Sequence, residues 1–94
     1  MKHLFIINPM SGSKKAMEFI PEIEQYFKDK DEEYSIAYTK YPMHAKELCE
    51  EYAKKGGYRI YIAGGDGSVN EAANGVAGYD TPIGILPAGS GNDF

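Results

Sequence analysis

Four short apolar segments alternate along the chain with segments in which apolar residues recur at helical spacing. The apolar segments cover residues 3–8, 34–39, 58–63 and 82–86. The first contains Leu4-Phe5-Ile6-Ile7, with no alternation of apolar and polar positions, which is typical of a strand covered on both faces. It ends at Asn8-Pro9, a dipeptide that interrupts regular structure. The pattern therefore predicts four strands.

The segments between these strands predict three helices. The second has its apolar positions on one face, at Ala45, Leu48, Cys49, Tyr52 and Ala53, and Gly56-Gly57 ends it. The third repeats the spacing at Val69, Ala72, Ala73 and Val76 and is expected to end near Gly78. The first carries a stripe at Ala16, Ile20, Ile23 and Phe27. Pro21 interrupts this stripe, so it either kinks the helix or marks the first turn of a second segment.

The order of elements predicts an α/β fold. Strands that alternate with helices form a parallel sheet whose crossover helices cover both faces, in three layers. We expect the crossovers to be right-handed. Ligands of such sheets bind at the carboxyl ends of the strands. The loops that follow the strands are therefore the places to look for a site.

Three of these loops are rich in glycine, serine or asparagine. They cover residues 8–13, 64–68 and 87–93, after the first, third and fourth strands. If the strands are parallel, all three loops emerge at one edge of the sheet. Loops with free backbone N–H groups and little side-chain bulk bind phosphate oxygens, helped by the dipole of the following helix.

The loop after the third strand is the most informative. It lacks the Lys-Ser/Thr ending of a P-loop, and Asn70 stands where the dinucleotide fingerprint needs its third glycine. What remains is a glycine loop with a carboxylate, Asp66, in its middle. A carboxylate near a triphosphate is repelled unless a divalent cation such as Mg²⁺ lies between them. The loop therefore favours a magnesium nucleotide, although Asp66 could also serve only a turn.

The residues that follow this loop have a structural interpretation as well. Ser68-Val69-Asn70-Glu71 fits a capping box, with Ser68 as the N-cap and Glu71 at the third helical position. A capped helix end still binds phosphate, so the two interpretations are compatible.

Composition and charge narrow the classes of function. The net charge of -4 excludes a general nucleic-acid binder, which needs a basic surface, so we expect no nucleic-acid partner. The chain has one cysteine, Cys49, so it forms no internal disulfide, and its place on an apolar helix face predicts a core residue. The longest apolar run is far too short to cross a bilayer. We expect a cytoplasmic protein whose membrane contact is peripheral.

The glycine loop and the helix after it resemble a known signature. Gly64-Gly65-Asp66-Gly67-Ser68, with Asn70-Glu71 and Asn74-Gly75, is similar to the GGDGT-x-NE-x-x-NG pattern of the diacylglycerol kinase catalytic superfamily. That group includes sphingosine kinases, ceramide kinases and bacterial lipid kinases. Three further segments resemble family elements in the family's order: Asn8-Pro9 with Ser11-Gly12, Thr39 with His44-Ala45, and Pro87 to Phe94. Serine replaces the commoner threonine at Ser68 and Ser90.

The resemblance implies a fold, a reaction and a set of site residues. The fold would be similar to the nucleotide domain of NAD kinase and phosphofructokinase, with ATP as donor, Mg²⁺ as cofactor and a lipid alcohol such as diacylglycerol as acceptor. The residues implied for the nucleotide site are Asn8, Ser11, Gly12, Thr39, Gly64, Gly65, Asp66, Gly67, Ser68, Glu71, Gly89, Ser90 and Asn92. The catalytic roles would fall to Asp66, which also holds the metal through water, and to Asp93.

The resemblance also implies a missing part. Family members continue into a second, mostly β domain that forms the other wall of the cleft, whereas this sequence of 94 residues corresponds to the nucleotide-binding domain. We therefore expect residues 1–94 to be inactive without that domain, and their uncovered apolar surface to favour a homo-oligomer. The membrane contact, at the inner face, would come through the parent protein. Two alternatives stay open: a kinase for a soluble acceptor, as in NAD kinase, and a non-catalytic nucleotide-binding module.

The two histidines and eight tyrosines add little at this level. His44 is interpreted as a helix-start residue with an exposed ring in preference to a catalytic group, because no partner is identifiable. His3 carries no signal. The tyrosines are expected to cover the sheet and its rim, and one of them could stack on adenine.

Overall fold

The computed structural model describes residues 2–9, 15–64 and 66–87, apart from the side chains of residues 15–17, 66 and 87. Strands and helices alternate within this part of the chain. The elements are β1 (Lys2–Ile7), α1 (Lys15–Phe27), β2 (Tyr34–Tyr38), α2 (His44–Lys55), β3 (Tyr58–Gly64), α3 (Asp66–Gly75) and β4 (Ile83–Pro87). Every predicted element is present, and the strand ends lie within about one residue of the predicted ends.

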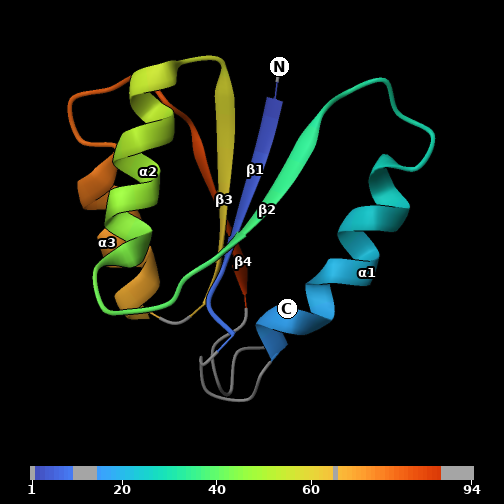
Figure 1. The fold of residues 1–94 in the computed structure, drawn as a ribbon, viewed down its shortest axis with the longest axis horizontal. Coiled ribbons are helices and arrows are strands. Elements are labelled where there is room, and N and C mark those ends of the chain that lie inside the picture. The colour runs from blue at the N-terminus through green and yellow to red at the C-terminus, as the bar shows by residue number, and fades with distance from the viewer. Residues whose placement is uncertain (1, 10–14, 65, 88–94) are drawn as a thin grey trace.

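In the described residues, the strands form one parallel sheet in the order β2-β1-β3-β4. Helix α1 covers one face of this sheet, and α2 and α3 cover the other (Figure 1). The predicted three-layer α/β fold is therefore confirmed. Because all strands run the same way, their carboxyl ends meet at the lower edge of the sheet in Figure 1.

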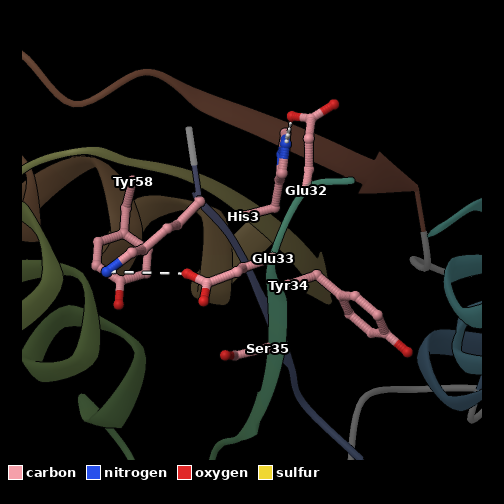
Figure 2. Close-up of a pocket in the computed structure, with 7 residues that line it drawn as sticks. His3, Glu32, Glu33, Tyr34, Ser35 and Tyr58 are labelled. Atoms are coloured by element: carbon pink, nitrogen blue, oxygen red, sulfur yellow. Dashed lines mark hydrogen bonds and ion pairs between the residues drawn. The ribbon is translucent and has the colours of Figure 1, made fainter. Parts of the chain in front are cut away.

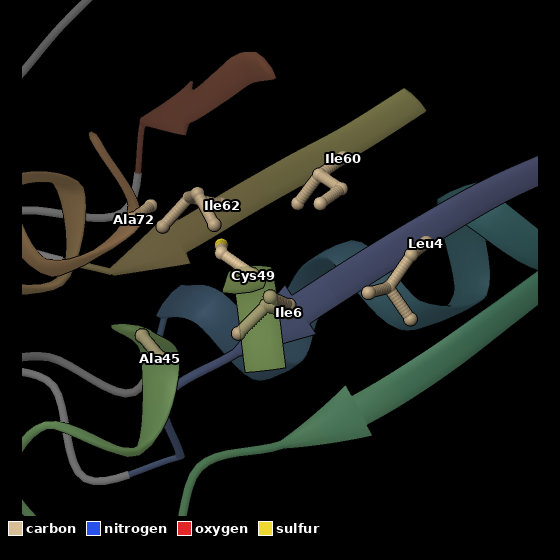
Figure 3. Packing of buried hydrophobic residues seen from close by; sticks show 7 residues of the cluster. All are labelled: Leu4, Ile6, Ala45, Cys49, Ile60, Ile62 and Ala72. Atoms are coloured by element: carbon tan, nitrogen blue, oxygen red, sulfur yellow. The ribbon is translucent and has the colours of Figure 1, made fainter. Parts of the chain in front are cut away.

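The larger core lies between the sheet and the helices α2 and α3. It is built from side chains that leave β1 and β3 on this face and meet small residues of the two helices (Figure 3). Its buried members are Leu4, Ile6, Ala45, Cys49, Ile60, Ile62 and Ala72. Small helix residues let the helices lie close to the branched side chains of the strands, which gives close packing.

Cys49 is a member of this core, as predicted. Its side chain is fully buried, and burial raises the pKa of the thiol to about 12. The thiolate is the reactive form of cysteine, so this thiol is inert in the folded protein.

Helices α2 and α3 lie in close contact at Gly75. A Cβ added there would lie 2.5 Å from the carbonyl oxygen of Lys46 and 2.7 Å from Cβ of Cys49. Both distances are below van der Waals contact. Only glycine therefore allows α3 to lie against the backbone of α2 at this point.

The smaller core lies between the sheet and α1. Ile23 and Phe27 of α1 pack against Phe5 and Ile7 of β1. The ring of Phe5 also stacks on that of Tyr61, with ring centroids 4.5 Å apart. The stack ties β1 to β3, so aromatic side chains of the sheet complete the cover that a single helix provides.

Helix α1 is continuous through Pro21. The alternative of a second segment that starts at this proline is therefore wrong. Pro21 is exposed, so its ring lies on the solvent side, although it cannot donate the backbone hydrogen bond to the preceding turn. Within the described residues, no helix combines the length and apolar character needed to cross a membrane.

Candidate functional site

The carboxyl ends of β1, β2 and β3 are tied together by backbone hydrogen bonds. The N–H of Asn8 donates to the carbonyl of Ala63 at 3.1 Å, just beyond the end of β1. The N–H of Thr39 donates to the carbonyl of Ile7 at 2.9 Å, just beyond the end of β2. Asn8 and Thr39, both predicted site residues, therefore lie at one edge of the sheet as the family resemblance implies.

Asn8 also reaches the start of α3. Its side-chain amide donates to Oγ of Ser68 at 3.4 Å, across 60 residues of sequence. Ser68 is buried, with 9% of its surface exposed. The first loop and the third-strand loop therefore meet at a polar contact, and two residues predicted from separate motifs are in fact neighbours.

Gly64 makes this contact possible. It is the last residue of β3, and a Cβ placed on it would lie 2.7 Å from Oγ of Ser68 and 3.5 Å from Cβ of Asn8. Any side chain at this position would push α3 away from the end of the strand. Gly64 thus has a structural role in holding the site together.

Gly67 is different, although it belongs to the same motif. It is exposed at the second position of α3, and a Cβ added there would have no neighbour within 4 Å among the residues that the structure describes. The packing described here therefore gives no reason for glycine at this position. Because glycine has no side chain, Gly67 does not obstruct a ligand that approaches the backbone N–H groups at the start of α3.

The start of α3 gives this edge of the sheet a partial positive charge. The first backbone N–H groups of a helix have no partner within the helix, and the helix dipole places partial positive charge there. Since α3 begins at Asp66, directly beyond the end of β3, these groups lie at the carboxyl edge of the sheet. They suit an anion such as a phosphate group.

The capping-box prediction is wrong. Helix α3 begins at Asp66, so Ser68 is its third residue and cannot be its N-cap. The hydroxyl of Ser68 accepts from Asn8 instead, and Glu71 lies half-buried in the second turn. The helix also ends at Gly75 rather than near Gly78. Local motif matching missed the earlier start because the glycines at the loop do not indicate a helix.

Several predicted site residues lie outside the described residues. These are Ser11, Gly12, Gly65, Gly89, Ser90, Asn92 and Asp93. The side chain of Asp66 is also outside the description, although its backbone begins α3. In the parts of the chain that the structure describes, no group of three or more His, Cys, Asp or Glu side chains is placed to hold a metal ion.

The segment between β2 and α2 runs along the same edge (Figure 1). His44, at the start of α2, is half-buried, and its Nδ1 accepts a hydrogen bond from the backbone N–H of Lys40 at 2.9 Å. Its ring stacks on that of Tyr41. The ring is therefore engaged in holding this segment, not simply exposed as the sequence predicted.

A pocket of about 380 Å³ lies at the opposite edge, beside the amino ends of β1, β2 and β3. His3 is 8% exposed there, and its Nε2 lies 2.6 Å from Oε1 of Glu32 (Figure 2). Its Nδ1 lies 3.1 Å from the hydroxyl of Tyr61. Lys2 and Glu33 form a second, looser pair at 3.9 Å. These polar groups pair with one another, so we assign the pocket a structural role. Sequence analysis missed His3 because its partners are 29 and 58 positions away.

The contact between His3 and Glu32 predicts how the stability of the folded protein depends on pH. The hydrogen bond from His3, with the charges of His3 and Lys30, holds the pKa of Glu32 below its usual 4.5. A carboxyl group whose pKa is lower in the folded state stabilises the protein above its unfolded pKa, and this stabilisation is lost as the pH falls through the folded pKa. Glu32→Gln should therefore unfold more easily than the wild type at pH values above 4.5, and the difference should shrink as the pH falls below that value and Glu32 becomes protonated.

Urea unfolding of both proteins across this pH range measures the effect. Glu33→Gln is the matched control, because Glu33 is the neighbouring residue and its ion pair with Lys2 is exposed and loose. It should show a smaller change with pH. A constant difference between wild type and Glu32→Gln at every pH would contradict the role of the charge.

The comparison with known proteins agrees with this geometry. The family described as "Diacylglycerol kinase catalytic domain" matches residues 2–94. Sphingosine kinase 2 of Arabidopsis thaliana is 36% identical over 97 residues, covering 95% of this chain and 20% of that protein. The diacylglycerol kinase of Bacillus subtilis strain 168 is 34% identical over 91 residues, covering 95% of this chain and 30% of that protein.

A solved structure shows the same fold. The crystal structure of a putative diacylglycerol kinase from Bacillus anthracis strain Sterne matches with a TM-score of 0.77 and 33% identity, covering 99% of this chain and 32% of that one. The chain thus spans about a fifth to a third of the length of these relatives. With a family match over residues 2–94 and a shared fold, the chain belongs to the diacylglycerol kinase catalytic domain family.

Proposed function

We propose that this chain is the nucleotide-binding part of a kinase that transfers a phosphoryl group from Mg-ATP to a lipid alcohol such as diacylglycerol. The main support for the proposal is the arrangement of residues at the carboxyl edge of the sheet. Asn8, Gly64 and Ser68 fix the end of β3 against the start of α3, and Gly67 adds no side chain there. Such an edge suits the phosphates of a nucleotide, because it offers backbone N–H groups and little steric bulk.

The magnesium ion would lie between the phosphates and Asp66, which would hold it through water. Mg²⁺ keeps several waters and binds through one or two carboxylates together with phosphate oxygens, so a single carboxylate in this loop would suit it. The ion would neutralise charge on the transferring phosphoryl group. The chain's own contribution would be to hold the phosphates in place, which is most of what phosphoryl transfer needs from a protein.

The lipid acceptor is supported by the relatives, which are named sphingosine kinase, diacylglycerol kinase and putative lipid kinase. We propose that a second domain of the parent protein supplies the other wall of the cleft and the peripheral contact with the inner face of the membrane. The loop with Gly89, Ser90, Asn92 and Asp93 would face donor and acceptor. Residues 1–94 without that domain would show no lipid kinase activity, because an open edge neither excludes water nor aligns the two substrates.

The test is Asp66→Asn in the intact kinase. Asparagine tolerates the same backbone but is a poorer partner for metal-bound water, so we expect kcat to fall about 10- to 100-fold. The midpoint of thermal unfolding should change little, because a carboxylate at a helix start contributes about 0.3–1 kcal/mol through the helix dipole. Turnover is measured on diacylglycerol, on sphingosine and on NAD, across Mg²⁺ concentrations.

The outcomes separate the parts of the proposal. Wild-type turnover by Asp66→Asn at all Mg²⁺ concentrations would contradict the role of Asp66. Phosphorylation of NAD but of neither lipid would replace the lipid acceptor by a soluble one. Binding of Mg-ATP with no transfer to any acceptor would indicate a nucleotide-binding module.

A further inference from the structure

The segment between β2 and α2, residues 39–43, is the part of the site edge that the phosphate-binding residues do not use. Thr39 lies beside the end of β1, and β1 separates β2 from β3 in the sheet. Two strand spacings, about 10 Å, therefore separate this segment from the loop after β3. A nucleotide whose phosphates lie at the start of α3 has a comparable separation between its phosphates and its base.

Tyr41 is the aromatic side chain of this segment. Nearly half of its surface, 49%, is exposed. Its ring lies almost parallel to that of His44, with centroids 4.3 Å apart and an angle of 13° between the planes. Its hydroxyl donates to Oε1 of Glu47 at 2.6 Å, and this bond raises the pKa of Tyr41. The ring is therefore held in place at its edge and on one side while much of it remains open to solvent.

The backbone around Tyr41 is braced as well. The N–H of His44 donates to the carbonyl of Tyr41 at 3.1 Å, and Nδ1 of His44 accepts from the N–H of Lys40. Met43 has φ of 73°, in the left-handed region that side chains other than glycine disfavour. A non-glycine residue in this conformation persists only where its surroundings hold it, and such positions cluster at ligand sites. The strain is consistent with a ring whose position matters.

From this geometry we infer that Tyr41 is the platform on which the base of the nucleotide stacks, an inference that rests on the proposed function. The base would lie on the side of the ring that His44 does not cover. A flat base gains stacking contact from a tyrosine ring, and a ring held before binding loses little freedom on binding. Tyr41 would thus position the nucleotide from the end opposite the phosphates.

Other exposed tyrosines are poorer candidates. Tyr26 lies on α1, where Lys30 covers its ring at 4.5 Å. Tyr38 ends β2 at the same edge as Tyr41 and is 40% exposed, but among the described residues it has no hydrogen bond or ring partner to hold it. Tyr38 is therefore the matched control: a tyrosine at the same edge without a fixed ring.

The experiment is calorimetric titration of the intact kinase with two probes, Mg-ATP and Mg-tripolyphosphate, which lacks a base. Tyr41→Leu keeps apolar bulk and removes the aromatic face, so we expect it to bind Mg-ATP about tenfold more weakly. Its affinity for Mg-tripolyphosphate should equal that of the wild type. Tyr41→Phe keeps the ring and should retain most of the affinity for Mg-ATP, and Tyr38→Leu should bind both probes as the wild type does.

Each other result counts against the inference. Unchanged binding of Mg-ATP by Tyr41→Leu would overturn it. So would an equal loss for both probes, because a residue that acts only by shaping the site would weaken both. A loss of Mg-ATP binding in Tyr38→Leu but not in Tyr41→Leu would move the base to the other ring. A wild-type kinase that binds neither probe would overturn the proposed function itself, a result distinct from the previous three.

Discussion

Replacing Gly75 with alanine is expected to lower the free energy of unfolding by about 1–3 kcal/mol, the usual cost of overpacking. The added methyl group would lie 2.5 Å from the carbonyl oxygen of Lys46. That oxygen belongs to the backbone of α2, so it cannot rotate away as a side chain would. Alanine is the better helix former by about 1 kcal/mol, so this substitution would stabilise an exposed helix position. We expect the clash to outweigh the gain, and urea unfolding measures the net effect.

Gly67 in the same helix is the matched control for this prediction. Since no described residue lies within 4 Å of its added Cβ, Gly67→Ala should not destabilise the protein and should gain up to about 1 kcal/mol from helix propensity. The two substitutions are chemically identical and differ only in surroundings. Equal unfolding midpoints for the two variants would show that α2 and α3 do not meet as closely as described.

Gly67→Ala is also expected to lower kcat/KM for ATP in the intact kinase by about 10- to 100-fold. This is the loss expected when a hydrogen bond to a charged group, worth about 1.5–3 kcal/mol, is prevented. The methyl group would stand between the start of α3 and a phosphate oxygen that approaches it. This variant should therefore be at least as stable as the wild type but less active. A loss of activity caused by unfolding would instead come with lower stability.

Steady-state kinetics with varied Mg-ATP, together with unfolding of the same preparation, measures both quantities. Tyr26→Ala is a suitable control for activity, because Tyr26 lies on α1 with 62% of its surface exposed and has no proposed part in the site. Full activity of Gly67→Ala would mean that the phosphates do not approach the start of α3. The proposed function would then lose its main support, which is a phosphate site at the carboxyl edge of the sheet.

The sequence by itself determined the fold class and the order of the elements. Continuous apolar runs such as Leu4 to Ile7 are long enough only for strands, and the helical stripe around Cys49 has the spacing of one face, so local pattern and tertiary structure agree. Sequence also predicted the edge of the sheet at which the site should lie, because ligand-binding loops follow the strands of a parallel sheet. The family resemblance rested on the same loops, and the family match confirmed it.

What only the tertiary structure decided is which residues touch. Ser68 matched a local capping motif, but its hydroxyl meets Asn8, which is 60 positions away. His3 had no local signal, yet it is buried between Glu32 and Tyr61. The glycines of the signature looked alike in sequence, whereas Gly64 and Gly75 are required by close contacts and Gly67 is not. Sequence periodicity reports which face of an element is buried, but a contact between distant segments depends on how the elements pack, and no local pattern encodes that.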